Sequence, residues 1–411
     1  MSGSLLSQAH HKRAMSLWFW AIFTLFFTRG VLMSTWSTQG PALRDALHLD
    51  LVAMGWYAAC LSVGSVTGVL ISERIVEKIG SRKYSVLSYT ILSLALILLG
   101  LNLSWEFTPL SFFITVLFGL PLGMADYDNN LEATNINREA AKNKVPLLHG
   151  GYSVGVLVGS ALVGIVLIAG IGITPDFIVV GAIMLALSLI ATLFIGKENG
   201  KAVIHTDSDS APLAKVRIGE IIAEKRSRQI GLIAFAFVFS EGVGVVWIPI
   251  SLVQNGFSAS DAAFGATLFG LGFVIMRFIG GPIADKIGRQ KVVLYSAITA
   301  AAGIIIFIMT PVIGLPLPGA LLWGLGNSIG LAMGVAALGD DATRVAARMS
   351  FLWTIVYVAN LVVGPTIGLL SGIGGLLAAF VAPLVFLVLA ATVSHSVDEE
   401  HPDAIKQEPN F

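Results

Sequence analysis

Charged residues and cysteines are scarce in this chain of 411 residues. Only 12% of the residues are charged and 55% are hydrophobic, whereas soluble domains carry roughly 25% charged residues. Cys60 is the single cysteine, which excludes an internal disulfide and a metal site built on thiolates. The 25 basic and 25 acidic residues balance, so no excess of positive charge indicates a nucleic-acid partner. We expect neither a metal nor another cofactor.

Long apolar runs make up most of the sequence. Cutting the chain at its polar interruptions gives twelve segments of roughly 20 residues, the length that crosses a bilayer as a helix. These segments are 16–40, 51–72, 84–102, 109–130, 146–170, 175–196, 229–250, 261–283, 291–310, 317–338, 348–370 and 373–394. The first run is too long for the apolar part of a cleaved signal peptide, so we expect it to remain as a helix. The sequence therefore predicts an all-α membrane protein.

The basic residues fall almost entirely on one side of these segments. When the connections are numbered alternately, twenty-two Lys and Arg residues lie on one side and only Arg44 on the other, while Arg29 and Arg277 lie inside spans. Positive charge is retained on the cytoplasmic side during insertion. We therefore expect both termini to be cytoplasmic, in a multi-pass protein of the cytoplasmic (inner) membrane.

The sequence divides into two halves that repeat. Residues 197–228 are the longest polar stretch and separate the spans six and six, which predicts bundles at 1–196 and 229–395, a cytoplasmic linker at 197–228 and a tail at 396–411. The sequence Thr-Arg-Gly-Val at 28–31 corresponds to Ser-Glu-Gly-Val at 240–243. Such parallel repeats are a common architecture of transporters.

A second repeat carries a resemblance to a known family. Residues 281–291 read G-x-x-x-D-K-x-G-R-x-K, and residues 73–83 form a degenerate copy with Glu77 in place of the Asp. This run resembles the signature between helices 2 and 3 of the major facilitator superfamily. The segments 119–130 and 149–155, together with Glu241 and Arg277, are similar to the fucose-permease-like branch. The resemblance implies two pseudo-symmetric six-helix bundles that work by alternating access in a monomer.

Two charged residues lie near the middle of equivalent spans. Arg29 and Glu241 each cost roughly 2.5–3.5 kcal/mol at the bilayer centre, so they must face protein or water. The family resemblance implies that their helices face each other across a central cavity. We interpret Glu241 as a proton-carrying group and Arg29 as a solute-binding group. The alternative is a salt bridge between the two that locks the bundles together.

Further polar residues follow on the neighbouring spans. Asp126 and His149 form a plausible proton relay, because burial can bring a carboxyl pKa towards that of histidine. We place Asn130 with the solute-binding residues, whereas Asp128 and Asn129 fit a hydrated helix end. Aromatic and amide side chains on central spans suit a sugar-like ligand; these are Trp36, Trp247, Asn327, Trp353, Tyr357 and Asn360.

Charged residues at the span ends predict a gate on the basic side. The resemblance implies that Glu77 and Asp285 meet the N-termini of the spans that begin at 348 and 146, where an anion is stabilised by the helix dipole. Arg82 and Arg289 belong to the same two motifs. Arg277 is a further gating candidate, with a partner at Asp126 or Asp128 across the bundles; the alternative is an intrabundle partner, Asp340 or Asp341.

These observations predict a secondary active transporter rather than an enzyme. The chain has no G-x-x-x-x-G-K-[ST] phosphate loop, so an ion gradient must drive it. We expect proton-coupled symport of a small polar solute, sugar-like or a carboxylate. The alternative is proton-coupled efflux of an amphipathic compound or a siderophore-like molecule. A membrane sensor would not need mid-membrane charges, and no clustered nucleophile or metal set suggests a membrane enzyme.

Overall fold

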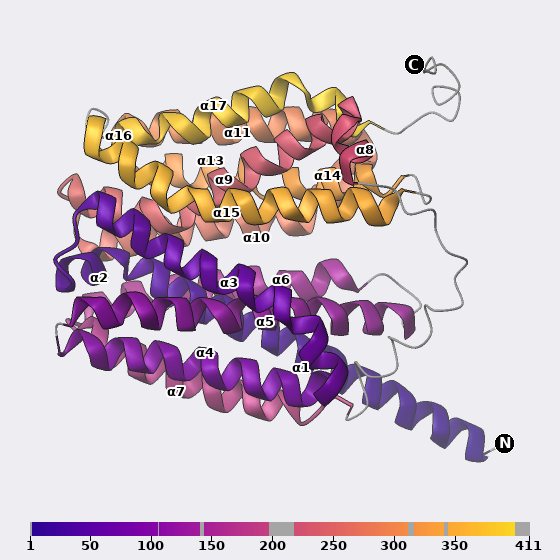
Figure 1. The fold of residues 1–411 in the computed structure, drawn as a ribbon. Helices are drawn as coiled ribbons and strands as arrows, with labels where there is room; N and C mark the ends of the chain where they lie inside the picture. Colours follow the sequence, from indigo (N-terminus) through magenta and orange to yellow (C-terminus); the bar gives the residue numbers. More distant parts are fainter. Residues whose placement is uncertain are drawn as a thin grey trace.

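The computed structural model describes residues 2–105, 107–139, 144–196, 218–310, 316–340 and 344–398. Within these ranges the secondary structure is helical throughout (Figure 1). Eleven helices of the described chain are long and apolar enough to cross a membrane, and a shorter apolar segment, Leu376–Thr392, follows them. The predicted all-α organisation is therefore confirmed. Most of the predicted linker and tail lies outside the described residues.

The N-terminal half forms one bundle. Its helices are α1 (Ser2–Thr38), α2 (Gly40–Ala46), α3 (Leu51–Ile79), α4 (Ser81–Leu103), α5 (Thr108–Glu139), α6 (Val145–Ile168) and α7 (Ile173–Thr192). The helix α5 extends nine residues beyond the predicted span 109–130. The pairs α3 with α5 and α1 with α6 pack closely, because a Cβ atom at Gly68 or Gly155 would clash with the backbone of the facing helix.

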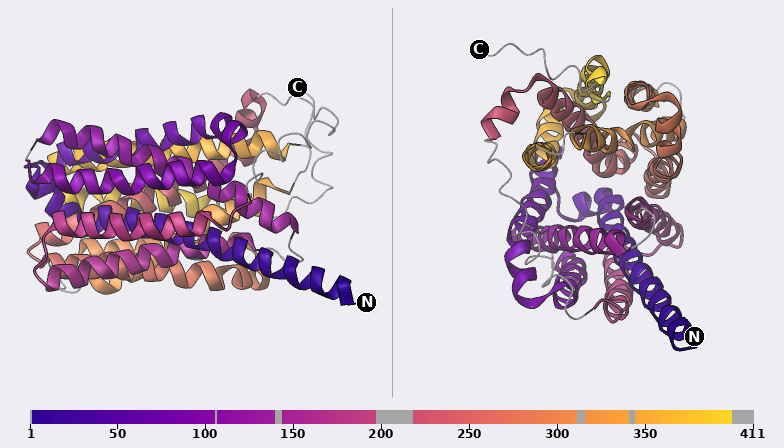
Figure 2. Two further views of the ribbon diagram at one scale, coloured as in Figure 1. Left: turned by 90° about the horizontal axis from the view of Figure 1, so that it is seen from below. Right: turned by 90° about the vertical axis from the view of Figure 1, so that its right-hand side faces the viewer.

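The C-terminal half forms the second bundle. Its helices are α8 (Ile218–Ala223), α9 (Lys225–Gln254), α10 (Ala259–Ile287), α11 (Arg289–Ile308), α13 (Leu317–Asn327), α14 (Gly330–Leu338), α15 (Val345–Gly374), α16 (Leu376–Ala379), α17 (Val381–Thr392) and the 3₁₀ helix η2 (Ser394–Val397). The predicted spans 317–338 and 373–394 are thus each divided into two helices. In the view along the helix axes, the two bundles occupy separate halves of the molecule (Figure 2).

The internal repeat is visible in the backbone of α3 and α10. Each begins with a side-chain cap: Asp50 accepts the Ala53 amide at 2.7 Å, and Ser258 accepts the Asp261 amide at 3.1 Å. Each ends at a glycine with positive φ, Gly80 at 77° and Gly288 at 87°, a conformation that favours glycine. The two halves therefore share local geometry at the signature motifs, not only sequence.

The bundles contact each other through α6 with α10 and through α3 with α15. We call the end that carries Gly80 and Gly288 the basic end. The α3–α15 contact lies towards the opposite end, where Gly55 meets Gly364 and the Ser62 hydroxyl donates to the Asn360 carbonyl at 3.0 Å. Towards the basic end these two helices diverge (Figure 1), and Leu70 on α3 is 72% exposed. Between α3 and α15, the two bundles are thus in contact at the end opposite to the basic end and apart at the basic end.

Candidate functional site

Buried charges from both bundles meet in the middle of the molecule. Arg29 lies on α1, Asp126 on α5, Glu241 on α9 and Arg277 on α10. None of the four is exposed, and they interact electrostatically with one another or with a shared neighbour. The structure therefore brings together, in one site, the mid-span charges that the sequence singled out.

Arg29 is paired within its own bundle. Its Nη1 lies 2.8 Å from Oδ1 of Asp126, with side chains 17% and 31% exposed. Its guanidinium also lies over the Tyr152 ring, 4.9 Å from the centroid, in a cation–π contact. The Nδ2 of Asn130 donates to the Asp126 carbonyl at 2.8 Å. The alternative salt bridge between Arg29 and Glu241 is wrong, because Asp126 occupies the position of the partner.

Glu241 and Arg277 share a cavity at the interface of the bundles. Its volume is about 30 Å³, and Tyr152, Phe269 and Phe273 also line it. Arg277 lies over the Phe273 ring at 5.9 Å. Glu241 interacts electrostatically with Arg277 and Arg29, yet among the described residues it forms neither a hydrogen bond nor an ion pair with either. An acid and a base, each half-buried, thus line one cavity.

The predicted partners of Arg277 are not the ones that the structure shows. Asp126 is bound to Arg29, and Asp340 is bound to Arg289 and Arg226 instead of Arg277. Asp341 lies outside the described residues. Arg277 therefore belongs to the central site, next to Glu241, rather than to an ion pair at the basic end.

His149 lies at the edge of this site. Its ring packs on Phe26 with 4.9 Å between the ring centroids, and it interacts electrostatically with Arg277, Asp126 and Arg29. The structure thus brings His149 and Asp126 near each other, although no hydrogen bond between these two described side chains is present. The proposed relay stays a prediction.

The predicted aromatic and amide residues divide into buried and accessible groups. Trp36 stacks on Tyr57 with 6.2 Å between ring centroids, and Trp247 and Asn327 are buried as well. The Asn327 amide donates to the Phe237 carbonyl at 2.8 Å. On α15, Trp353 is 41% exposed, Asn360 is exposed, and Tyr357 interacts electrostatically with Asp126 and Arg29. Of these six residues, Tyr357 is the one that joins the central charges.

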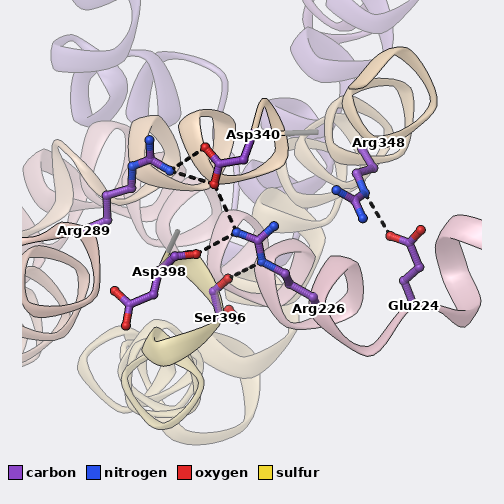
Figure 3. A network of polar contacts seen from close by, with 7 residues as sticks. All are labelled: Glu224, Arg226, Arg289, Asp340, Arg348, Ser396 and Asp398. Carbon is purple, nitrogen blue, oxygen red and sulfur yellow. Dashed lines mark hydrogen bonds and ion pairs between the residues drawn. The ribbon is translucent and has the colours of Figure 1, made fainter. Parts of the chain in front are cut away.

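The predicted gate residues lie at the basic end. Glu77 and Asp285 are exposed, and Arg82 is half-buried. Arg289 donates to both carboxylate oxygens of Asp340, at 2.8 and 2.9 Å, and Arg226 binds the same carboxylate at 3.3 Å (Figure 3). Arg226 also donates to the carbonyls of Ser396 and Asp398. The second signature motif is thus joined to the start of α9, the end of α14 and the segment after α17.

Glu224 is a polar residue that the sequence analysis missed. It accepts hydrogen bonds from Ser227 at 2.7 Å, Arg344 at 2.6 Å and Arg348 at 3.0 Å. Burial alone would raise the pKa of Glu224, but these hydrogen bonds lower it below its ordinary value. Glu224 precedes α9, whereas both arginines belong to the start of α15. The carboxylate therefore fixes two helices of the C-terminal bundle at the basic end.

A second missed cluster lies inside the N-terminal bundle. Asp128 is fully buried and accepts hydrogen bonds from Ser81 at 2.5 Å and from Ser85, while Asn129 donates to the Tyr89 hydroxyl at 2.8 Å. The expectation of a hydrated helix end is therefore wrong, because α4 covers these side chains. The four-residue spacing of Ser81 and Ser85 puts both hydroxyls on one face of α4, and this sequence signal could have revealed the contact.

Comparison with known proteins shows similarity to one family. The family model of the Major Facilitator Superfamily matches residues 230–410. An uncharacterized MFS-type transporter of Yersinia pestis is 25% identical over 375 residues, which are 90% of this chain and 94% of that protein. Multidrug resistance protein 2 of Bacillus subtilis is 24% identical over 301 residues, covering 71% of this chain and 72% of the relative.

Solved structures with the same fold cover nearly the whole chain. The nucleoside transporter NupG has a TM-score of 0.70 at 13% identity, covering 95% of this chain and all 100% of its own. The D-xylose-proton symporter has a TM-score of 0.68 at 16% identity, and the match covers 92% of this chain and 96% of the symporter. FucP, in the outward conformation, has a TM-score of 0.60 at 15% identity, and the match covers 93% of this chain and 99% of FucP.

The fold and the site define a multi-pass membrane protein with a charged centre between two pseudo-symmetric six-helix bundles. The chain is similar over most of its length to transporters of the major facilitator superfamily, and the model of that superfamily matches its C-terminal half. The fold class predicted from the signature motifs is therefore confirmed.

Proposed function

We propose that this protein is a proton-coupled symporter that takes up a small polar solute, sugar-like or a carboxylate, by alternating access. The observation that carries the proposal is the central site, in which Arg29 and Asp126 of one bundle face Glu241 and Arg277 of the other. Charges at this depth are costly and typically mark a substrate or ion pathway. All of these groups come from one chain, so a monomer is sufficient.

Glu241 is the group to which we assign the transported proton. It is the acid of the central site that has no bonded partner among the described residues, whereas Asp126 is held by Arg29 at 2.8 Å. Asp126 and His149 form the route between Glu241 and the basic end, where α3 and α15 diverge. Arg29 and Tyr357, with Asn130 one helical turn from Asp126, form the solute-binding side of the site.

The gate follows from the same geometry. We assign the basic end to the cytoplasm, with both termini on that side of the inner membrane, because the sequence assigns twenty-two basic residues to the connections and chain ends on that side of the spans. Glu77 and Asp285 are exposed in the present arrangement, which fits an inward-open state. Closing this end would bring both acids against helix N-termini of the opposite bundle, where their charges are stabilised. Residues 1–196 and 229–395 would then move as the two rigid bundles.

Comparing proton-driven accumulation with solute exchange distinguishes loss of proton coupling from loss of solute binding. In proteoliposomes, Glu241→Gln is expected to abolish accumulation driven by a proton gradient while solute exchange across the membrane continues, because the variant keeps the cavity and loses the titrating group. Glu73→Gln, at an exposed acid on α3, is the matched control and should accumulate solute normally. Gradient-driven accumulation by Glu241→Gln at the wild-type level would disprove the proton assignment.

Efflux of an amphipathic compound is the second candidate. The name of the Bacillus subtilis relative, Multidrug resistance protein 2, favours it, and so do Phe269 and Phe273 in the wall of the cavity. The two candidates differ in direction. An inward proton gradient drives accumulation inside the vesicle for symport, and it drives loss of a preloaded compound for antiport.

A further inference from the structure

The central site holds two acids and two arginines, but they are not equivalent. Arg29 and Asp126 neutralise each other directly at 2.8 Å. Glu241 and Arg277 line the same small cavity without an ion pair between them. The charges of Arg29 and Asp126 already compensate each other. A change in the net charge of the site is therefore expected at Glu241 and Arg277.

Arg277 depends on Glu241 for its compensating charge. The cation lies over the Phe273 ring, and the wall around it is mainly apolar, with Ser34, Tyr152 and Ser153 as its uncharged polar residues. An uncompensated charge in such a position costs several kcal/mol, which a nearby opposite charge repays. When Glu241 takes up a proton, its carboxylate no longer stabilises the Arg277 cation. The cavity then favours any other anion that can reach the guanidinium.

No other charged group nearby can replace Glu241 in this role. The groups that act on Glu241 are Arg277 on α10, Arg29 on α1 and Tyr152 on α6. His149 acts on Arg277 from α6, but it is a base and adds no negative charge. Among the other helices packed against α9, α13, α14 and α17 contain no charged residue, and α15 carries Arg348, a cation that binds Glu224 at the basic end. A solute anion is therefore the natural substitute.

We infer that the solute is a small monovalent carboxylate whose anion binds Arg277 in place of Glu241 and crosses together with the proton on Glu241. The inference rests on the proposed function and specifies its substrate class and stoichiometry. A guanidinium binds a carboxylate through two parallel hydrogen bonds. Only one cation becomes free when Glu241 is protonated, so one negative charge fits and two do not. Phe269 and Phe273 are the apolar part of the wall that a short carbon chain would contact, once the cavity widens from its present volume of about 30 Å³.

Two consequences distinguish this arrangement from transport of a neutral sugar. First, each cycle moves one proton and one anion, so transport responds to a pH gradient and not to membrane potential. Second, anion binding and protonation of Glu241 assist each other equally, as thermodynamic linkage requires. The affinity for the anion then falls up to tenfold per pH unit once Glu241 ionises.

Matched pairs of acids and neutral analogues test the inference in the purified full-length protein. The panel pairs lactate with lactamide, gluconate with glucose and benzoate with benzamide, and adds succinate as a dianion above neutral pH. Thermal stabilisation is measured between pH 5 and pH 8. We expect at least one monocarboxylate to stabilise the protein with an affinity that falls as pH rises, while its neutral partner has no effect. Stabilisation by a neutral partner or by the dianion at pH 8, or by no acid at all, would overturn the inference.

Variants then assign the effect to the two residues. Arg277→Gln should lose acid binding at every pH, Arg277→Lys should recover part of it, and Glu241→Gln should bind the acid with an affinity that no longer depends on pH. Arg74→Gln, at an exposed arginine of α3, is the control for the loss of a positive charge. Unchanged binding in Arg277→Gln, or an unchanged pH dependence in Glu241→Gln, would contradict the assignment.

Transport measurements separate failure of this inference from failure of the proposed function. With the acid that binds, uptake into proteoliposomes should follow an imposed pH gradient and should not change when valinomycin and potassium set the membrane potential. Proton-driven uptake of a neutral sugar would disprove the carboxylate inference and leave proton symport standing. Binding of the acid without any proton-driven uptake would refute the symport function itself.

Discussion

The ion pair between Arg29 and Asp126 supplies the sharpest stability prediction. Replacing Asp126 with Asn keeps the shape of the side chain and the hydrogen bond from Asn130 to the backbone, but leaves Arg29 without its partner. Removing one member of a buried pair costs roughly 3–5 kcal/mol, and we expect the lower end, about 3 kcal/mol. The reason is that Asp126 retains 31% exposure and Arg29 17%, so water compensates part of the loss.

A double-mutant cycle isolates this energy. Arg29→Met with Asp126→Leu removes both charges and should be destabilised by less than about 1 kcal/mol, because apolar replacement of a buried pair is often neutral. Glu241→Gln removes an acid for which the described part of the chain supplies no bonded partner, so the stability of this variant should stay near that of the wild type. The measurement is unfolding in detergent followed by tryptophan fluorescence. Equal losses in Asp126→Asn and Glu241→Gln, or a double variant no more stable than Asp126→Asn, would refute the pairing as the source of stability.

The remaining predictions concern the basic end. Glu77→Gln and Asp285→Asn should shift the population further towards the inward-open state, because each removes a charge–dipole contact that only the closed end makes. Accessibility of single cysteines on the two faces, in a Cys60→Ser background, measures the shift, and unchanged labelling would argue against the gate. The lowered pKa of Glu224 means that its ionised form stabilises the fold. That contribution is complete above the ordinary glutamate pKa and is lost as pH falls through the lowered one. The measurement is the unfolding temperature between pH 3 and pH 7. In the wild type and in the exposed control Glu220→Gln it should fall at low pH through the loss of this contribution, and in Glu224→Gln that part of the fall should be missing.

The sequence predicted the architecture well because hydropathy and positive charge act on whole segments. All twelve predicted spans correspond to helices, although 317–338 is divided after Asn327 and 373–394 is divided at Phe380. Gly375, with φ of 83°, lies just before α16. Such breaks depend on one or two backbone angles, which hydropathy does not record. The basic motifs at Gly80 and Gly288 could be recognised in the sequence, because a turn with positive φ requires glycine at a fixed position.

The partners of the central charges were less predictable. Symmetry related Arg29 to Glu241, and the sequence allowed an ion pair between them. The actual partner of Arg29 is Asp126 on α5, because α1 and α5 belong to the same bundle and pack side by side. Likewise, Asp128 is covered by serines of α4, a contact that requires the rotation of α5 about its own axis. Pairing across helices depends on such rotations, which a single sequence does not fix.

The distribution of these pairs between the bundles bears on the transport cycle. Arg29 with Asp126 lies wholly in the N-terminal bundle, and Glu241 with Arg277 lies wholly in the C-terminal bundle. A rocking motion therefore leaves both pairs intact, so breaking them is not the energetic cost of switching. Tyr152 lies between the pairs, since its ring carries Arg29 and also lines the cavity of Glu241 and Arg277. Tyr357 of α15 is a second link, because it interacts electrostatically with Arg29 and Asp126. Proton and solute can shift the position of the bundles only through such contacts, and only where these differ between the two states.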